Sequence, residues 1–203
     1  LPDGIVNIST DTGYMTRIQC GSADFSIMGF DSDDYPELPS IDQHRGITLP
    51  QNILGEMIRQ TIFAVSDNEA RPVYTGELFE IADGCLTLVA VDGYRLALRR
   101  EKVEKEMENY SFIVPGNALS DLEKLCGDNE EDVSIALGNK HISFTIGKTV
   151  IISRRLEGDF LNYKKTVPSA FNVKVRADRH MLQRTVERVS LIIDDKIKNP
   201  LRC

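Results

Sequence analysis

Apolar and polar residues alternate along several short stretches of the chain, which is the pattern of strands with one buried face. The stretch 86–100 holds two apolar-rich runs that meet at an Asp-Gly pair, Asp92 and Gly93. An Asp-Gly pair between such runs predicts a β-hairpin, because glycine adopts positive φ without steric cost. In the second run Tyr94, Leu96 and Leu98 form the apolar set, so we expect them on the buried face of a strand over 93–99.

Similar runs and turn residues predict further strands along the chain. These strands are expected at 5–9, 14–20, 24–28, 47–49, 77–81, 85–91, 110–114, 133–137, 141–146, 149–154 and 173–175. Three amphipathic helices are expected where apolar residues recur at helical spacing. Pro50 opens the first, which extends to about Val65; Pro115 opens the second; the third spans 178–193. Polar linkers follow at 31–40 and 157–168.

The predicted elements recur in order, which indicates internal repeats. The second helix start matches the first at an offset of 65 residues, and the third helix matches the first at an offset of 128. The unit is therefore a strand, a helix and three strands, and two units form a domain. We expect an α+β fold in which two units pack side by side, with helices on one face and a continuous antiparallel sheet on the other. The expected domains are 1–44, truncated at its start, 45–168, complete, and 169–203, truncated at its end; the chain is expected to be cut from a longer protein.

Composition narrows the class of protein. Lys and Arg total 24 against 31 Asp and Glu, a net charge of −7, which argues against a protein that coats nucleic acid by its bulk field. The four cysteines lie far apart, without zinc-type pairs, and free thiols are typical of a reducing cytoplasm. No run reaches the ~20 apolar residues of a membrane span.

An enzymatic reading finds little support. Carboxylates at Asp31, Asp33, Asp34 and Asp42 resemble a calcium loop, but Pro36 stands where that loop requires glycine, which favours an acidic linker. The three histidines lie far apart and no nucleophile motif accompanies them. We expect neither a metal nor a cofactor. The remaining alternative is a stand-alone scaffold that is built from the same repeats and binds no DNA.

Several motifs, in order along nearly the whole chain, resemble the bacterial sliding clamp, the beta subunit of DNA polymerase III. They are Phe25-Ser-Ile, Asp34-Tyr-Pro-Glu-Leu-Pro39, Arg71-Pro-Val-Tyr-Thr-Gly-Glu-Leu-Phe79, Leu86-Thr-Leu-Val-Ala-Val-Asp-Gly-Tyr-Arg-Leu-Ala97 and Glu157-Gly-Asp-Phe-Leu-Asn-Tyr163. The resemblance implies the DNA-clamp fold, three similar domains per subunit, and a homodimeric ring whose helices line a hole around duplex DNA. It implies a non-catalytic processivity factor of DNA replication, in the cytoplasm, which tethers the polymerase alpha subunit, the clamp loader and other partners.

The resemblance also implies a groove for short partner peptides beside the 86–100 hairpin. The residues carried over are Tyr74, Val91, Gly93, Tyr94, Arg95, Leu96, Leu161, Lys165, Thr166 and Ile197. An apolar pocket would take leucine and aromatic anchors of the peptide, while Arg95 and Lys165 would orient its polar or acidic groups. Val91 and Leu96 fit a purely core role equally well. Tyr74, Leu161, Asn162 and Lys165 depart from the family pattern, and the far wall of the groove lies outside this sequence, so weak or no peptide binding is expected.

Contacts to DNA are expected from sparse basic residues. The candidates are Arg59, Asn68, Arg71, Lys124, Arg184 and Arg188. Acidic neighbours dilute them, and a loose electrostatic lining suits a ring that slides. For each basic residue taken alone, a solvated surface charge is the simpler interpretation.

Overall fold

The computed structural model describes residues 1–35, 37, 39, 41, 46–103, 109–168 and 170–192. The strands are β1 (Asn7–Thr10), β2 (Met15–Cys20), β3 (Ala23–Met28), β4 (Gly46–Pro50), β5 (Gly76–Ala82), β6 (Cys85–Val91), β7 (Leu96–Lys102), β8 (Tyr110–Pro115), β9 (Asp132–Leu137), β10 (His141–Ile146) and β11 (Thr149–Arg154). The helices are α1 (Gln51–Arg59), α2 (Gly116–Leu125), α3 (Tyr163–Thr166) and α4 (Arg179–Ser190), with short 3-10 turns η1 (Ser32–Asp34), η2 (Ile62–Ala64) and η3 (Pro72–Tyr74). The chain divides into two compact units, 1–160 and 161–203, which are described separately.

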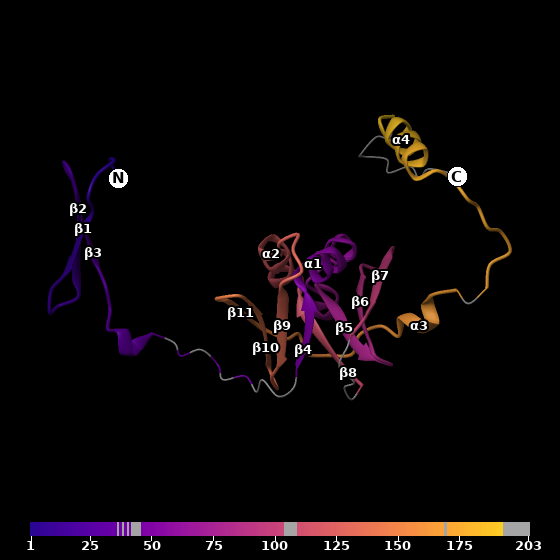
Figure 1. The fold of residues 1–203 in the computed structure, drawn as a ribbon, viewed down its shortest axis with the longest axis horizontal. Helices are drawn as coiled ribbons and strands as arrows, with labels where there is room; N and C mark the ends of the chain where they lie inside the picture. The colour runs from indigo at the N-terminus through magenta and orange to yellow at the C-terminus, as the bar shows by residue number, and fades with distance from the viewer. Residues whose placement is uncertain are drawn as a thin grey trace. The chain divides into compact units, whose positions relative to one another are not determined.

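Strands β4 to β11 form two four-stranded antiparallel sheets (Figure 1). One sheet has the order β11-β10-β9-β4 and the other β7-β6-β5-β8. Each sheet takes three strands from one repeat and its fourth strand from the other, because β4 pairs with β9 while β8 pairs with β5. The expected continuous sheet is thus two sheets, with one isolated bridge between Ile113 and Leu156.

The two repeats share a single hydrophobic core. Helices α1 and α2 pack against each other, and both contribute to a buried cluster that includes residues of both sheets. In this cluster the Phe79 ring stacks on Phe112 of the same sheet, with centroids 5.3 Å apart, and its centroid lies 6.4 Å from that of Phe144 of the other sheet. Because strands and helices of both repeats bury the same cluster, neither repeat has a core of its own.

The order of strands and helices confirms the repeat, while several boundaries differ from expectation. Pro50 and Pro115 lie just before α1 and α2 rather than inside them. Helix α1 ends at Arg59, and the apolar positions expected to continue it to Val65 form the turn η2 instead. Thr61, just after the end of the helix, is fully buried, and its hydroxyl lies 2.8 Å from the Glu77 carboxyl of β5, a contact that joins the chain to the sheet at this point.

The start of α1 is fixed by a buried glutamine. Gln51 is only 3% exposed, and its side chain accepts from the backbone N–H of Gly127 at 2.7 Å and donates to Asn129 and Glu131. Its backbone N–H donates to the carbonyl oxygen of Glu131 at 2.8 Å. The acidic loop after α2 therefore supplies the partners that the first turn of α1 lacks.

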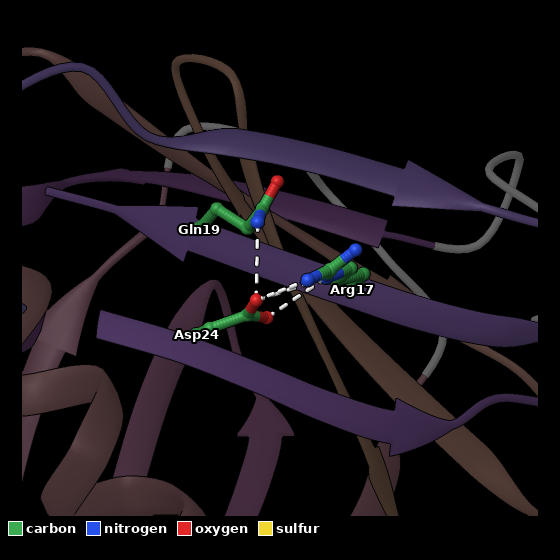
Figure 2. Close-up of polar contacts among 3 residues, drawn as sticks. All are labelled: Arg17, Gln19 and Asp24. Atoms are coloured by element: carbon green, nitrogen blue, oxygen red, sulfur yellow. Dashed lines mark hydrogen bonds and ion pairs between the residues drawn. The ribbon is translucent and has the colours of Figure 1, made fainter. Parts of the chain in front are cut away.

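Strands β1 to β3 form a separate three-stranded meander. One face is polar: Figure 2 shows Arg17 paired with Asp24, whose carboxylate also accepts from Gln19 at 3.1 Å. The opposite face places Ile8, Ile18 and Phe25 side by side in register. The alternation predicted for these strands is therefore present as two chemically distinct faces.

In the second unit, Asp178 caps α4 by accepting from the backbone N–H of Met181 at 2.8 Å. The strand expected at 173–175 is absent: these residues are exposed and pair with none of the described strands. A strand needs a neighbour for its backbone hydrogen bonds, which β4 finds in β9, whereas 173–175 have none among the described residues. No helix in the described part of the chain is long and apolar enough to cross a membrane.

Candidate functional site

The 86–100 stretch forms the predicted hairpin, although the turn lies slightly later than expected. Val91 pairs with Leu96, and the intervening residues make the turn. The Asp92 carboxylate accepts from the backbone N–H groups of Tyr94 and Arg95, both at 3.0 Å. Gly93 has φ +91°, in the left-handed region that favours glycine. The Asp-Gly pair works as expected, but β7 begins at Leu96 rather than at residue 93.

The buried face of β7 is opposite to the one predicted. Tyr94 is fully exposed and Leu98 is 43% exposed, while Ala97 is buried. Ala97 packs with Ala64 and Ala90, so the turn η2 lies directly on β6 and β7. The contact with η2 therefore covers the face of β7 that carries Ala97.

Arg95 lies at the tip of this hairpin and is held from two sides. Its Nε donates to the Asp92 carboxylate at 2.7 Å, and its guanidinium lies 5.7 Å from the centre of the Phe63 ring. The Tyr94 and Arg95 N–H bonds, together with the Arg95 side chain, hold the pKa of Asp92 below its usual range. Arg95 and Phe63 also line a surface pocket of about 520 Å³ between η2 and the start of α2.

The other groove residues of the first unit occupy different elements. Val91 is 6% exposed, which favours a core role, and Leu96 is half-buried. Tyr74 ends η3 and its ring meets that of Phe160 edge-on at 5.6 Å. The structure thus joins Val91 and Leu96 as a pair beneath the hairpin tip, whereas Tyr74 packs on a different residue.

The remaining groove candidates belong to the second unit. Leu161 precedes α3, and Lys165 and Thr166 lie within it. The Lys165 N–H donates to the carbonyl oxygen of Asn162 at 3.1 Å, and this bond helps to close the single turn. Ile197 lies outside the described residues, as does the expected end of the third helix at residue 193.

The candidate DNA-facing residues on the first two helices are already paired. Arg59 donates to Glu123 across the α1–α2 contact at 2.8 Å, and Lys124 lies 3.0 Å from Asp121. The pairing with Glu123 raises the pKa of Arg59, which stays charged. Among the residues of these two helices, acids outnumber bases, so this pair of helices offers no positive surface of its own.

The other DNA candidates are exposed. Asn68 and Arg71 lie in the loop after η2, where the Asn68 side chain accepts from the Ala70 N–H at 2.9 Å and shapes the loop. Arg184 and Arg188 lie one turn apart on α4. This spacing gives α4 the clearest pair of adjacent positive charges among the predicted residues.

A buried carboxyl group escaped the sequence analysis. Glu77 of β5 is fully buried, and Thr61 approaches one of its oxygens at 2.8 Å, while the other has no hydrogen-bond partner among the described residues. Burial raises the pKa of Glu77 to about 8, and the Thr61 bond opposes that rise. Glu77 is therefore mostly protonated at neutral pH. The sequence around Glu77 gave no sign of this burial, since alternation alone does not say which of the two faces of a strand is covered.

No group of residues that could bind a metal occurs within the described ranges. Burial raises the pKa of the Cys126 thiol to about 11, so this cysteine stays protonated and inert. Neither observation suggests covalent chemistry.

Comparisons with known proteins agree with this architecture. The family model of the DNA polymerase III beta subunit central domain matches residues 48–162. The beta sliding clamp of Halalkalibacterium halodurans is 37% identical over 95% of this chain and 51% of that protein, and the one of Bacillus subtilis is 32% identical over 100% and 54%. A crystal structure of a DNA polymerase III beta subunit from Eubacterium rectale superimposes with a TM-score of 0.87 at 34% identity, covering 97% of this chain and 54% of that one.

The fold is that of the sliding clamps. The family model covers more than half of the chain, and the chain belongs to the DNA polymerase III beta subunit family. It spans about half the length of the relatives that it matches.

Proposed function

We propose that this chain is part of a DNA sliding clamp: a ring that encircles duplex DNA without sequence preference and tethers the replicative polymerase during synthesis. The observation that carries the proposal is the pair of strand-exchanged repeats around one core, in a family whose members are named beta sliding clamps. The clamp itself performs no covalent step, and any polymerase activity belongs to the holoenzyme.

Three segments of the chain have separate parts in this proposal. Residues 1–44 would complete one clamp domain, 45–168 form a second, and 169–203 begin a third. In the complete ring, a homodimer in the cytoplasm, helices such as α1, α2 and α4 would face the DNA. Of the candidate contacts, we assign Arg184, Arg188, Asn68 and Arg71 greater weight, because Arg59 and Lys124 are neutralised by ion pairs.

The β6–β7 hairpin would form one side of a groove for partner peptides from the polymerase alpha subunit, the clamp loader and other proteins. Leu96 supplies a half-buried apolar surface and Arg95 a fixed cation, while Tyr74, Leu161, Lys165, Thr166 and Ile197 would extend the groove. A short peptide with apolar anchors fits such a surface, since a few buried side chains carry most of the binding energy.

The test is a chimera in which this chain replaces the matching half of the Bacillus subtilis clamp. We expect the loaded chimera to stay on nicked circular DNA during gel filtration and to leave once the circle is cut. If the chimera were lost to the same extent from intact circles and from cut circles, the result would contradict a ring. Assembly with partner peptides but without DNA would instead support a scaffold.

A further inference from the structure

Glu77 is a carboxyl group inside the hydrophobic core region, on the same face of β5 as Phe79. Its Oε2 lies 2.8 Å from Oγ of Thr61, and its Oε1 has no hydrogen-bond partner among the described residues. A buried carboxylate with an unpaired oxygen carries a large desolvation cost. The folded chain therefore accommodates the protonated form of Glu77 in preference to the ionised one.

The Thr61 hydroxyl has more acceptors around it than hydrogens to donate. Thr61 is fully buried, and its Oγ lies 2.9 Å from the carbonyl oxygen of Met57 and 3.3 Å from that of Ile58, besides the Glu77 oxygen. A hydroxyl donates one hydrogen and can accept others at its lone pairs. When that hydrogen is directed to a backbone carbonyl, the hydrogen shared with Glu77 has to belong to Glu77. Only a protonated Glu77 meets this requirement.

No charged side chain in the described part of the chain accounts for the state of Glu77. Glu77 pairs with Val114 of β8, while Cys85 of β6 and Tyr110 of β8 pair with β5 at its other end. The titratable residues of α1, α2, η3 and the inner face of β7 are exposed or partly exposed: Glu56, Arg59, Tyr74, Arg99, Glu101, Asp121, Glu123 and Lys124. Burial raises the pKa of Glu77, and the Thr61 hydroxyl lowers it. Access to water, rather than a neighbouring charge, thus decides whether Glu77 keeps its proton.

The contact between Glu77 and Thr61 joins the turn η2 to the sheet. Thr61 directly precedes η2, and its carbonyl oxygen accepts from the backbone N–H of Ala64 at 3.0 Å. Ala64 is the fully buried side chain of this turn, and it packs on two further alanines, one in β6 and one in β7. Small side chains bury little apolar area, so the hydrogen bond to Glu77 is a substantial part of what holds the turn closed.

We propose that Glu77 and Thr61 form a proton-dependent latch, in which protonated Glu77 donates to Thr61 and keeps η2 closed, whereas loss of the proton to solvent opens η2 and lets water reach the carboxylate. The inference concerns this chain alone and does not depend on the proposed function. The pKa of Glu77 is about 8 in the closed form, against an ordinary value of 4.5. Closure is therefore strongest at low pH, and opening should become about tenfold more favourable per pH unit between these two values and then level off.

The test is amide hydrogen exchange of the wild-type chain at several pH values and at low urea, expressed as protection relative to the intrinsic exchange rate. We expect the protection of the Ala64 amide to fall with the pH dependence given above and to be insensitive to low urea, because a local opening exposes little surface. The Cys126 amide, which donates to the Leu122 carbonyl oxygen at the end of α2, is the matched control and should change little. If Ala64 exchanged only when the whole chain unfolds, the latch would be overturned.

Two substitutions assign the effect to the latch. Glu77→Gln keeps a side-chain donor for Thr61 but cannot titrate, so the protection of Ala64 should become independent of pH. Thr61→Val should lower that protection about tenfold at about pH 6, where Glu77 is still protonated, and Thr61→Ser should leave it nearly unchanged. The same pH slope in Glu77→Gln as in the wild type, or equal protection in Thr61→Val and the wild type, would refute the proposal.

A measurement that needs no variant follows the proton directly. The carbon-13 NMR signal of the Glu77 carboxyl group in the wild-type chain should titrate with its midpoint where the protection of Ala64 levels off. A Glu77 signal that titrates at the ordinary value of a glutamate while η2 stays protected would also overturn the latch.

Discussion

The two repeats, β4 to β7 and β8 to β11, follow the same plan but differ clearly at a buried position and at a turn. Glu77 and Val133 occupy equivalent places, since Glu77 pairs with Val114 of β8 and Val133 pairs with Leu49 of β4. Both are fully buried. The first repeat thus places a carboxyl group where the second places an apolar side chain.

The hairpins of the two repeats also differ, in the form of their turns. The second repeat joins β10 and β11 by a tight turn at 147–148, whereas the first joins β6 and β7 by the Asp92-capped turn that presents Arg95. Only the first repeat has the turn η2 after its helix among the described residues. The two copies of one framework therefore differ in the chemistry of a buried position and in the form of the turn after the second strand of the sheet.

The largest effect is expected where the repeats are equivalent. Leu54 of α1 and Leu119 of α2 are both fully buried in the shared core. Leu54→Ala and Leu119→Ala should each lower the free energy of unfolding by about 2–5 kcal/mol, because each leaves a cavity in one common core. Urea denaturation measures this, with the half-exposed Leu125→Ala as the control. A cost no larger than that of Leu125→Ala, for either variant, would show that its leucine does not pack in the common core.

The next effect concerns the buried carboxyl. Because the folded state binds the Glu77 proton more tightly than the unfolded state, stability should fall as pH rises from about 4.5 to about 8. Glu77→Val, which copies Val133, should remove that decline and stabilise the chain at pH 8–9 by about 1–3 kcal/mol. Denaturation at several pH values measures this change in stability, with the exposed Glu130→Gln as the control. If the stability of Glu77→Val declined with pH as steeply as that of the wild type, a group other than Glu77 would be responsible for the decline.

A smaller, local effect is expected at the hairpin tip. Asp92→Ala removes the acceptor of two N–H groups and the partner of Arg95, so the amides of Tyr94 and Arg95 should exchange with solvent several-fold faster. In the wild type this protection should be present above the ordinary carboxyl pKa and should disappear as pH falls through the lowered Asp92 value. Lys148→Ala, in the corresponding turn of the second repeat, should leave these amides unchanged. If the amides of Tyr94 and Arg95 exchanged at the same rate in Asp92→Ala as in the wild type, packing alone would order the hairpin tip.

The smallest effect is expected from the ion pair between the helices. Arg59 and Glu123 are 61% and 25% exposed, and solvent screens such a pair. Arg59→Ala, Glu123→Ala and the double variant should leave the melting temperature nearly unchanged, with no coupling in the double-mutant cycle. A clear coupling would show that this pair contributes to the contact between the repeats.

Local pattern was enough to locate most elements. All three helix starts, to within one residue, the strands of both repeats and the Asp-Gly hairpin follow from spacing and turn chemistry, because the groups involved lie within a few residues of one another. The predictions that were wrong concern places where a contact between residues far apart in the sequence determines the structure. Helix α1 ends where the Thr61 hydroxyl meets the Glu77 carboxyl of β5, and β7 turns its alanine inward because η2 lies on it.

The candidate site was predicted in part. The motif that contains Arg95 drew attention to the hairpin, and the structure supplies its fixed geometry, but the groove as a whole stays a prediction. Phe63 and Glu77 were absent from it, since one appeared to be a residue at the end of a helix and the other a charge on a strand. Neither exposure of an aromatic ring nor burial of an acid is visible in sequence spacing.

The sequence by itself determined the repeat, the order of its elements and the residues at its turns, because these depend on backbone preferences and on periods of two and 3.6 residues. The tertiary structure alone decided that each repeat lends its first strand to the other's sheet, and that Phe63 and Arg95 meet. Both outcomes depend on hydrogen bonds and packing between residues far apart in the chain. Their free energy depends on which surfaces meet, and local pattern does not specify that.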